Sequence, residues 1–414
     1  MPDATDHRLA QQYEAYPYPQ RDPRDEAGRL LLGSPSHLRE IDHWVFGARR
    51  PRSRPLRVLV AGGGTGDAAI MLAAQMRRLG QPGHVTYLDR SDAARRVAQA
   101  RAVARGLDNI SFHAGSLLDL DGAGLGVFDY IDCCGVLHHL PDPAAGLAAL
   151  LSVLAPEGGM GLMVYAPHGR TGVTMIQDAL RLLAPEHQPL AQRLDAARRL
   201  LRQLPETAWL RQNRSVTDHL VGGDAGLADL LLNPRDQSFT IIRLLGLLAA
   251  RGLVATCLLE PMRYDPATYL ADPRLRAAAA LLAPLPRAQL AEDLSGAMST
   301  HVVYCRRADD AGLAPDGLAG EAVPVAREVP GEALARQIRA DGVLEVSFEG
   351  VAHPVPLPAL AGPLLRLVDG QRNLAAIAAE MAARGTPHPA FDRAWAELWA
   401  RLSAGNRLLL APPP

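Results

Sequence analysis

A run of apolar residues leads directly into a glycine-rich turn near residue 60. The segment VLVAGGGTGD, Val58 to Asp67, places β-branched residues before Gly62, Gly64 and Gly66. Glycine tolerates positive φ and lets a ligand approach the backbone closely. The free amides at the start of the following helix would face that ligand, as is typical of nucleotide sites in open α/β sheets. The alternative is a plain turn between a strand and a helix.

The surrounding sequence alternates short apolar runs with helical segments, which predicts a parallel sheet with crossover helices. The predicted strands are Arg57–Ala61, His84–Asp89, Ile110–His113, Phe128–Cys133 and Met160–Tyr165. The predicted helices are Asp67–Leu79, Asp92–Arg105 and Pro143–Leu154. Two further runs, Leu253–Leu259 and His301–Arg306, are expected to pair antiparallel at one edge of the sheet. The pattern therefore predicts a seven-stranded, doubly wound α/β sheet of the Rossmann-like type.

Composition divides the chain into four parts, the second of which contains an insertion. Residues 1–50 form an aromatic, partly helical N-terminal cap, and residues 51–307 form the main domain. Within that domain, residues 170–250 are rich in Leu, Ala and Arg at helical spacing, which predicts a helical insertion. Residues 308–332 lack an apolar period and are expected to be a linker. Residues 333–414 are predicted to form a small, winged-helix-like accessory module.

Asp89 follows the second predicted strand, 25 positions after Gly64. A carboxylate at about this offset binds the ribose hydroxyls of a nucleotide cofactor. Alternatively, Asp89 caps the next helix, although Ser91 is the better N-cap candidate.

Two longer strings decide between the possible cofactors. FDYIDCCGVLHHLPDP begins at Phe128, and LAALLSVLAPEGGMGLMVY begins at Leu147. Together with GGGTG, which lacks the GxGxxG spacing of NAD enzymes, they resemble the class I S-adenosylmethionine-dependent methyltransferases. The resemblance covers roughly Pro55 to Arg306.

The resemblance implies that S-adenosylmethionine is the cofactor and assigns its contacts. The implied contact residues are Gly62, Gly64 and Gly66 at the methionine part, Asp89 at the ribose, Arg90, Ser116 and Leu117 at the adenine, and Cys134 and Gly135 at the sulfonium. Ser116 stands where the family often has an acidic residue for the adenine amino group. A serine can still form a hydrogen bond there.

His138 and His139 follow the fourth predicted strand and are candidate general bases. The alternative is that this pair only shapes the pocket. Cys133 and Cys134 are expected to be packing residues, because free cysteine is among the most buried residue types.

Tyr13, Tyr16 and Tyr18 in YEAYPYP are candidates for a flap over the pocket, or else they pack the N-terminus onto the helical layer. Arg170 follows the fifth predicted strand and could bind an acidic substrate group, or could be a solvated loop residue. The segment Leu227–Thr240 of the insertion is expected to roof the substrate pocket.

Charge and cysteine usage narrow the function further. Lys plus Arg is 43 against 44 for Asp plus Glu, so no net positive field favours nucleic acid. Four cysteines without CxxC spacing predict neither a disulfide framework nor a metal site. The N-terminus lacks a basic stretch followed by an apolar one, and no apolar run reaches the ~18 residues of a membrane span, so the expected location is cytoplasmic. We therefore expect a methyltransferase with a small-molecule or protein acceptor. An RNA methyltransferase and a cofactor-binding regulator are the alternatives, and the oligomeric state stays open.

Overall fold

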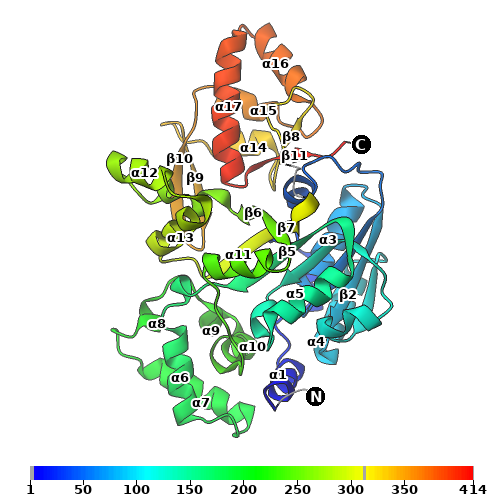
Figure 1. Ribbon diagram of the computed structural model, residues 1–414, viewed down its shortest axis with the longest axis vertical. Helices are drawn as coiled ribbons and strands as arrows, with labels where there is room; N and C mark the ends of the chain where they lie inside the picture. The colour runs from blue at the N-terminus through cyan, green and yellow to red at the C-terminus, as the bar shows by residue number, and fades with distance from the viewer. Residues whose placement is uncertain (1–3, 311–313, 414) are drawn as a thin grey trace.

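A seven-stranded sheet forms the centre of the computed structural model, which describes residues 4–310 and 314–413 (Figure 1). The strands are β1 (Leu56–Ala61), β2 (Gly83–Asp89), β3 (Ile110–Ala114), β4 (Phe128–Cys134), β5 (Leu154–Tyr165), β6 (Leu253–Leu259) and β7 (Thr300–Arg307). Their order across the sheet is β3-β2-β1-β4-β5-β7-β6. Strands β1 to β5 are parallel, and β7 runs antiparallel to both β5 and β6. The predicted fold class is confirmed.

Both faces of the sheet are covered, which is why its central strands are almost continuously apolar. In β1, Val58 and Val60 point into one buried cluster, while Leu59 points into another on the opposite face. The second cluster also contains Ile131 and Leu162 of the neighbouring strands.

Two of the three crossover helices, α4 (Asp92–Ala104) and α5 (Pro143–Ser152), begin at a residue whose side chain caps them. The third is α3 (Asp67–Arg78). The hydroxyl of Ser91 accepts a hydrogen bond from the amide of Ala94 at 3.1 Å, so Ser91 caps α4 as expected. Asp142 caps α5 in the same way, ahead of Pro143.

A helical layer lies beside the carboxyl ends of the strands. It comprises α6 (Val173–Leu183), α7 (Leu190–Gln203), α8 (Trp209–Gln212), α9 (Asp218–Val221), α10 (Gly223–Leu227) and the π-helical turn η6 (Ala228–Leu232). The next helix, α11 (Ile241–Ala249), packs on a face of the sheet, with Leu244 and Leu248 in the same cluster as Leu59. The N-terminal helix α1 (Ala4–Ala15) lies at the same end of the molecule as the helical layer (Figure 1). Gln12 of α1 donates a hydrogen bond to the carbonyl of Ala228. Helices α12 (Pro273–Ala280) and α13 (Pro284–Ser295) then connect β6 to β7.

The C-terminal part has a hydrophobic core of its own, at the end of the molecule away from α6 and α7 (Figure 1). It contains β8 (Val323–Ala326), α14 (Gly331–Arg336), β9 (Val343–Phe348), β10 (Val351–Pro356), α15 (Ala361–Arg366), α16 (Leu374–Ala383), α17 (His388–Ala404) and β11 (Leu408–Ala411). Strand β8, inside the segment expected to be a linker, pairs antiparallel with β11.

The N-terminal segment joins this module to the sheet. Two short elements, α2 (Leu38–Glu40) and the π-helical turn η2 (Ile41–Val45), pack against the sheet. The indole of Trp44 donates to Asn406 at 3.1 Å, and Glu40 pairs with Arg327. Among residues 4–310 and 314–413, no helix has the length and apolar character that a membrane span requires.

Candidate active site

A hydrogen bond joins the backbone of the glycine-rich turn to the side chain of Asp89. The amide of Gly64 donates to one carboxylate oxygen of Asp89 at 2.7 Å, and the amide of Ser91 donates to the other at 2.8 Å. Burial raises the pKa of Asp89, and the two amides oppose that rise by favouring the ionised form. The carboxylate is thus held in a fixed position at the carboxyl end of β2.

Gly64 has to be glycine in this turn. Its φ is +51°, and a β-carbon would lie 2.9 Å from the carbonyl oxygen of Tyr18. The hydroxyl of Thr65 donates to the carbonyl of Pro19 at 2.7 Å. The Tyr18–Pro19 backbone therefore lies directly over the turn.

The turn opens into a cavity of about 1150 Å³. Most of the predicted site residues line it: Gly62, Gly64, Asp89, Arg90, Ser116, Leu117, Cys134, Gly135, His139, Tyr13 and Tyr18. Among the described residues, four of the predicted ones lie outside the cavity wall, namely Gly66, His138, Tyr16 and Arg170.

Gly66 supports the turn through helix packing. It precedes α3 with a φ of +101°, and a β-carbon there would lie 2.8 Å from the β-carbon of Ala98. The close approach of α3 to α4 therefore requires glycine. Tyr16 instead packs against the apolar core of the helical insertion.

His138 and Arg170 sandwich the ring of Tyr165. The His138 ring stacks on Tyr165 with centroids 3.9 Å apart, and the guanidinium of Arg170 lies 3.7 Å from the Tyr165 centroid. Burial lowers the pKa of His138 well below its ordinary value, so the ring stays neutral. Arg170 is buried and pairs with Asp236 at 2.5 Å. Both residues therefore position Tyr165.

His139 lies in the cavity wall with its ring held in place. Its Nδ1 lies 2.7 Å from the carbonyl oxygen of Arg235, which only a protonated Nδ1 can bond. A neutral His139 therefore carries its lone pair on Nε2. Burial raises the pKa of both Cys133 and Cys134, so both side chains are thiols, and Cys133 is part of the core.

The helical insertion contributes two acidic residues to the cavity that the sequence analysis did not single out. Asp229 of η6 accepts hydrogen bonds from Tyr13 at 2.8 Å and from Tyr165 at 3.0 Å. Asp218 of α9 accepts one from Tyr18 at 3.0 Å. These bonds fasten the N-terminal tyrosines to the insertion, so the two segments form a common roof.

Asp132 of β4 is a further acidic residue in the cavity wall. Its side chain is fully buried, and within the described part of the chain neither carboxylate oxygen has a hydrogen-bond partner. Burial raises its pKa to about 7; the nearby Ser36 hydroxyl opposes that rise but forms no hydrogen bond with either oxygen. The sequence signal for this residue was an aspartate in the middle of a strand whose other residues, apart from Asp129, are apolar or aromatic.

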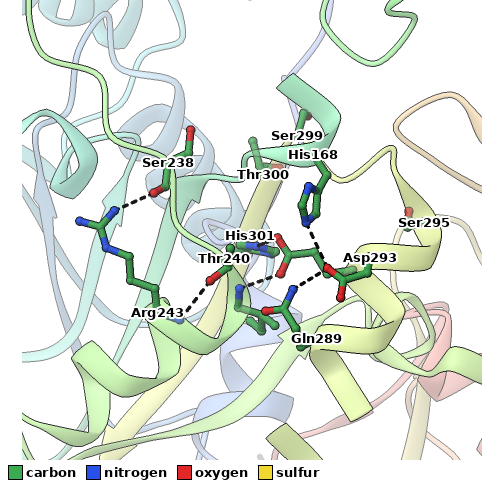
Figure 2. Close-up of polar contacts among 12 residues, drawn as sticks. His168, Ser238, Thr240, Arg243, Gln289, Asp293, Ser295, Ser299, Thr300 and His301 are labelled. Atoms are coloured by element: carbon green, nitrogen blue, oxygen red, sulfur yellow. Dashed lines mark hydrogen bonds and ion pairs between the residues drawn. The ribbon is translucent and has the colours of Figure 1, made fainter. Parts of the chain in front are cut away.

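A buried polar network holds the start of β7, where Thr300 lines the cavity (Figure 2). The ring of His301 lies 3.2 Å from Glu292 of α13 and 2.9 Å from the hydroxyl of Tyr264. Glu292 also accepts from the amide of Ile241, the first residue of α11. The network ties β7, α11, α13 and the turn containing Tyr264 together beside the cavity.

The C-terminal module also contacts the start of β7. Glu349, in the turn between β9 and β10, accepts hydrogen bonds from the backbone and hydroxyl groups of Ser299 and Thr300. It also pairs with Arg263 at 2.6 Å. The module therefore contacts the residue that lines the far end of the cavity.

Comparisons with known proteins agree with this geometry. Residues 59–160 match the family described as a methyltransferase domain. This match and the strand order confirm the resemblance of the sequence motifs to the class I S-adenosylmethionine-dependent methyltransferases.

Individual relatives match parts of the chain. An uncharacterized protein of Synechococcus sp. is 32% identical over 269 residues, 64% of this chain and 63% of that protein. The tRNA 5-carboxymethoxyuridine methyltransferase of Escherichia coli is 37% identical over 119 residues, 28% of this chain and 42% of that enzyme. The chain thus spans less than two thirds of the length of either relative.

One solved structure resembles nearly the whole chain. PKMT2 from Rickettsia typhi in complex with AdoHcy has a TM-score of 0.60 at 15% identity, covering 91% of this chain and 75% of that protein. At this identity the likeness concerns the fold. It extends beyond the sheet to the insertion and much of the C-terminal module.

Proposed function

We propose that the protein transfers the methyl group of S-adenosylmethionine to a small-molecule or protein acceptor. The main support for this proposal is the hydrogen bond between Gly64 and Asp89, because both residues line a cavity that is larger than a single ligand needs. Ligand pockets usually measure about 300–1,000 Å³. A cavity of about 1150 Å³ accommodates a cofactor and part of an acceptor together.

The residues of the cavity fit the proposed cofactor. Asp89 offers carboxylate oxygens to the ribose hydroxyls, and the Gly62–Gly64 backbone leaves room for the methionine part. Leu117 and Leu140 provide apolar surface for the adenine. The cofactor supplies a methyl group on a sulfonium, which is already electrophilic, so the protein mainly aligns the acceptor and excludes water.

The wall of the cavity is rich in aspartate, which argues against RNA as the methyl acceptor. Of the described residues lining the cavity, seven are aspartates and two are arginines, Arg21 and Arg90. Arg21 pairs with Asp67 at 2.7 Å, so its charge is compensated. Phosphate groups need clustered Lys and Arg. The cavity also extends past the proposed cofactor contacts, which supports an enzyme over a regulator that only binds the cofactor.

The test is transfer of labelled methyl groups from S-adenosylmethionine into a cell extract. The extract is divided into a small-molecule filtrate, a nuclease-treated protein fraction and a protease-treated RNA fraction. We expect label in the filtrate or the protein fraction with the wild type, and none with Asp89→Ala. Label confined to the RNA fraction contradicts the proposed acceptor class.

A further inference from the structure

One part of the cavity adjoins Cys134, the proposed sulfonium contact, and its other lining residues are not proposed cofactor contacts. Its floor is formed by Asp132 and Cys134 of β4, Met163 and Tyr165 of β5, and Thr300 of β7. Cys134 is paired with Met163, and Tyr165 with Thr300, so their side chains share one face of the sheet. Ser34 and Ser36 of the N-terminal segment also line this part.

Asp132 is the unusual member of this floor. It is fully buried, and among the residues that the structure describes no donor satisfies either of its oxygens. A carboxylate that is buried without a hydrogen-bond or ion-pair partner destabilises the folded state. Buried carboxylates are therefore nearly always paired, and an unpaired one indicates a functional role. Since Asp132 borders the cavity, the partner that it lacks can be supplied by a ligand.

The roof above this floor is acidic and aromatic. Asp229 is buried and accepts bonds from two phenols, Tyr13 and Tyr165. Asp218 accepts a bond from the phenol of Tyr18. Phenol donors leave the negative charge of a carboxylate uncompensated, and aromatic faces attract cations. Floor and roof together favour a positively charged group and disfavour an anionic one.

We propose that the methyl acceptor is an amine, which enters as an ammonium group and is bound and deprotonated by Asp132. This inference rests on the proposed methyltransferase function. The ammonium group gives one proton to the Asp132 carboxylate, and the neutral amine then attacks the methyl carbon. The new N–C bond forms as the C–S bond breaks, and the electron pair of that bond stays on sulfur. The products are a methylated ammonium group and S-adenosylhomocysteine, with the proton left on Asp132 for release.

The burial of Asp132 suits this task. Its raised pKa of about 7 makes the carboxylate a stronger base than an exposed aspartate near neutral pH. A neutral hydroxyl acceptor would gain less from the acidic roof, because it carries no charge when it binds.

The test compares the wild type with Asp132→Asn and with Asp121→Asn, which removes an exposed carboxylate outside the cavity wall. Calorimetric titration with S-adenosylhomocysteine comes first. We expect equal affinities for the three proteins. Failure of the wild type to bind overturns the proposed function itself. Weaker binding by Asp132→Asn alone overturns the further inference, because Asp132 would then serve the cofactor.

The second titration adds n-butylamine, or n-butanol as its uncharged analogue, to protein saturated with S-adenosylhomocysteine. We expect the amine to bind and the alcohol not to bind. Asp132→Asn should weaken amine binding about tenfold or more, as expected when a buried charge loses its partner, and Asp121→Asn should not. No amine binding by the wild type, equal binding of amine and alcohol, or an unaffected Asp132→Asn variant overturns the inference.

A third measurement identifies the source of the amine. Methyl transfer is assayed to spermidine, as a free amine, and to a lysine-containing peptide with its N-terminus acetylated. Transfer to either that depends on Asp132 supports the amine class and distinguishes a small molecule from a protein side chain. Transfer to neither, under conditions in which an alcohol or thiol probe is methylated, contradicts it.

Discussion

The amide of Gly64 donates a hydrogen bond of 2.7 Å to the carboxylate of Asp89, across the carboxyl ends of β1 and β2. The bond fixes both parts of the proposed cofactor site relative to each other. The hydroxyl of Tyr87 holds the same turn from below, by donating to the carbonyl of Gly64 at 2.6 Å. The site is therefore organised before any ligand binds.

Replacing Asp89 by alanine should weaken binding of S-adenosylmethionine by about 2–4 kcal/mol. The variant loses the proposed charge-assisted ribose bonds, each worth roughly 1.5–3 kcal/mol, and releases the Gly64 amide. Calorimetric titration checks this change. Asp92→Asn is the control, because Asp92 lies outside the cavity wall and, within the described part of the chain, forms an ion pair with Arg95 alone. An unchanged affinity of Asp89→Ala would place the cofactor elsewhere.

Removing both phenols that bond to Asp229 should cost more stability than the sum of the single changes. Tyr13→Phe or Tyr165→Phe alone should cost about 0.5–1.5 kcal/mol, because one donor remains. The double variant leaves a buried carboxylate without its phenol donors, which should cost roughly 1–3 kcal/mol more. Urea unfolding measures these values, with Tyr16→Phe as the control. Strict additivity would show that the two bonds do not share Asp229 as their acceptor in solution.

The sequence predicted the central sheet well because its signals are local. The β-branched runs, the glycine turn and Asp89 lie close together in the chain, and β1, β2 and β4 match their predicted ranges within a residue or so. The tyrosine flap and the Leu227–Thr240 roof were expected separately, but the bond that joins them could not be predicted, because Tyr13 and Asp229 are 216 residues apart. The pairing of β8 with β11 and the contact of Glu349 with Ser299 are likewise long-range.

Asp132→Asn should stabilise the protein at alkaline but not at acidic pH. The pKa of Asp132 is about 7 in the folded state against an ordinary value of 3.8, so the folded state binds the proton more tightly. Its ionisation therefore destabilises the fold progressively as the pH rises from about 4 to about 7. Each pKa unit corresponds to about 1.4 kcal/mol, so the gain above this window should be a few kcal/mol.

Urea unfolding of the wild type and Asp132→Asn at about pH 4 and about pH 8 measures this difference. We expect the two proteins to be similarly stable at about pH 4 and Asp132→Asn to be more stable than the wild type at about pH 8. An equal difference at both pH values would mean that Asp132 does not titrate in this range.

The C-terminal module should depend on the pair of Arg327 and Glu40. Glu40 is fully buried and also accepts a bond of 2.6 Å from Tyr304 of β7. Burial raises the pKa of Glu40, but the charge of Arg327 together with His37 and the hydrogen bonds from Tyr304 and Asn406 outweighs it, so the net shift is downward. Arg327→Met leaves this carboxylate without its cation, which should cost about 3–5 kcal/mol in unfolding experiments.

Two comparisons make that prediction specific. Arg336→Met removes an exposed pair with Glu332 and should change stability by less than about 1 kcal/mol. Replacing Glu40 and Arg327 together by leucine should recover part of the loss, because no charge is then left buried without a partner. If Arg327→Met is as stable as the wild type, the module is not held by this pair.

Calorimetric titration of the purified protein with S-adenosylmethionine, S-adenosylhomocysteine and NAD tests directly whether the cavity binds a methyltransferase cofactor. We expect S-adenosylmethionine and S-adenosylhomocysteine to bind at one site per chain and to lose affinity in Asp89→Ala. We expect NAD not to bind. Binding of NAD alone, or of none of the three, would contradict the assignment of this cavity to a methyltransferase.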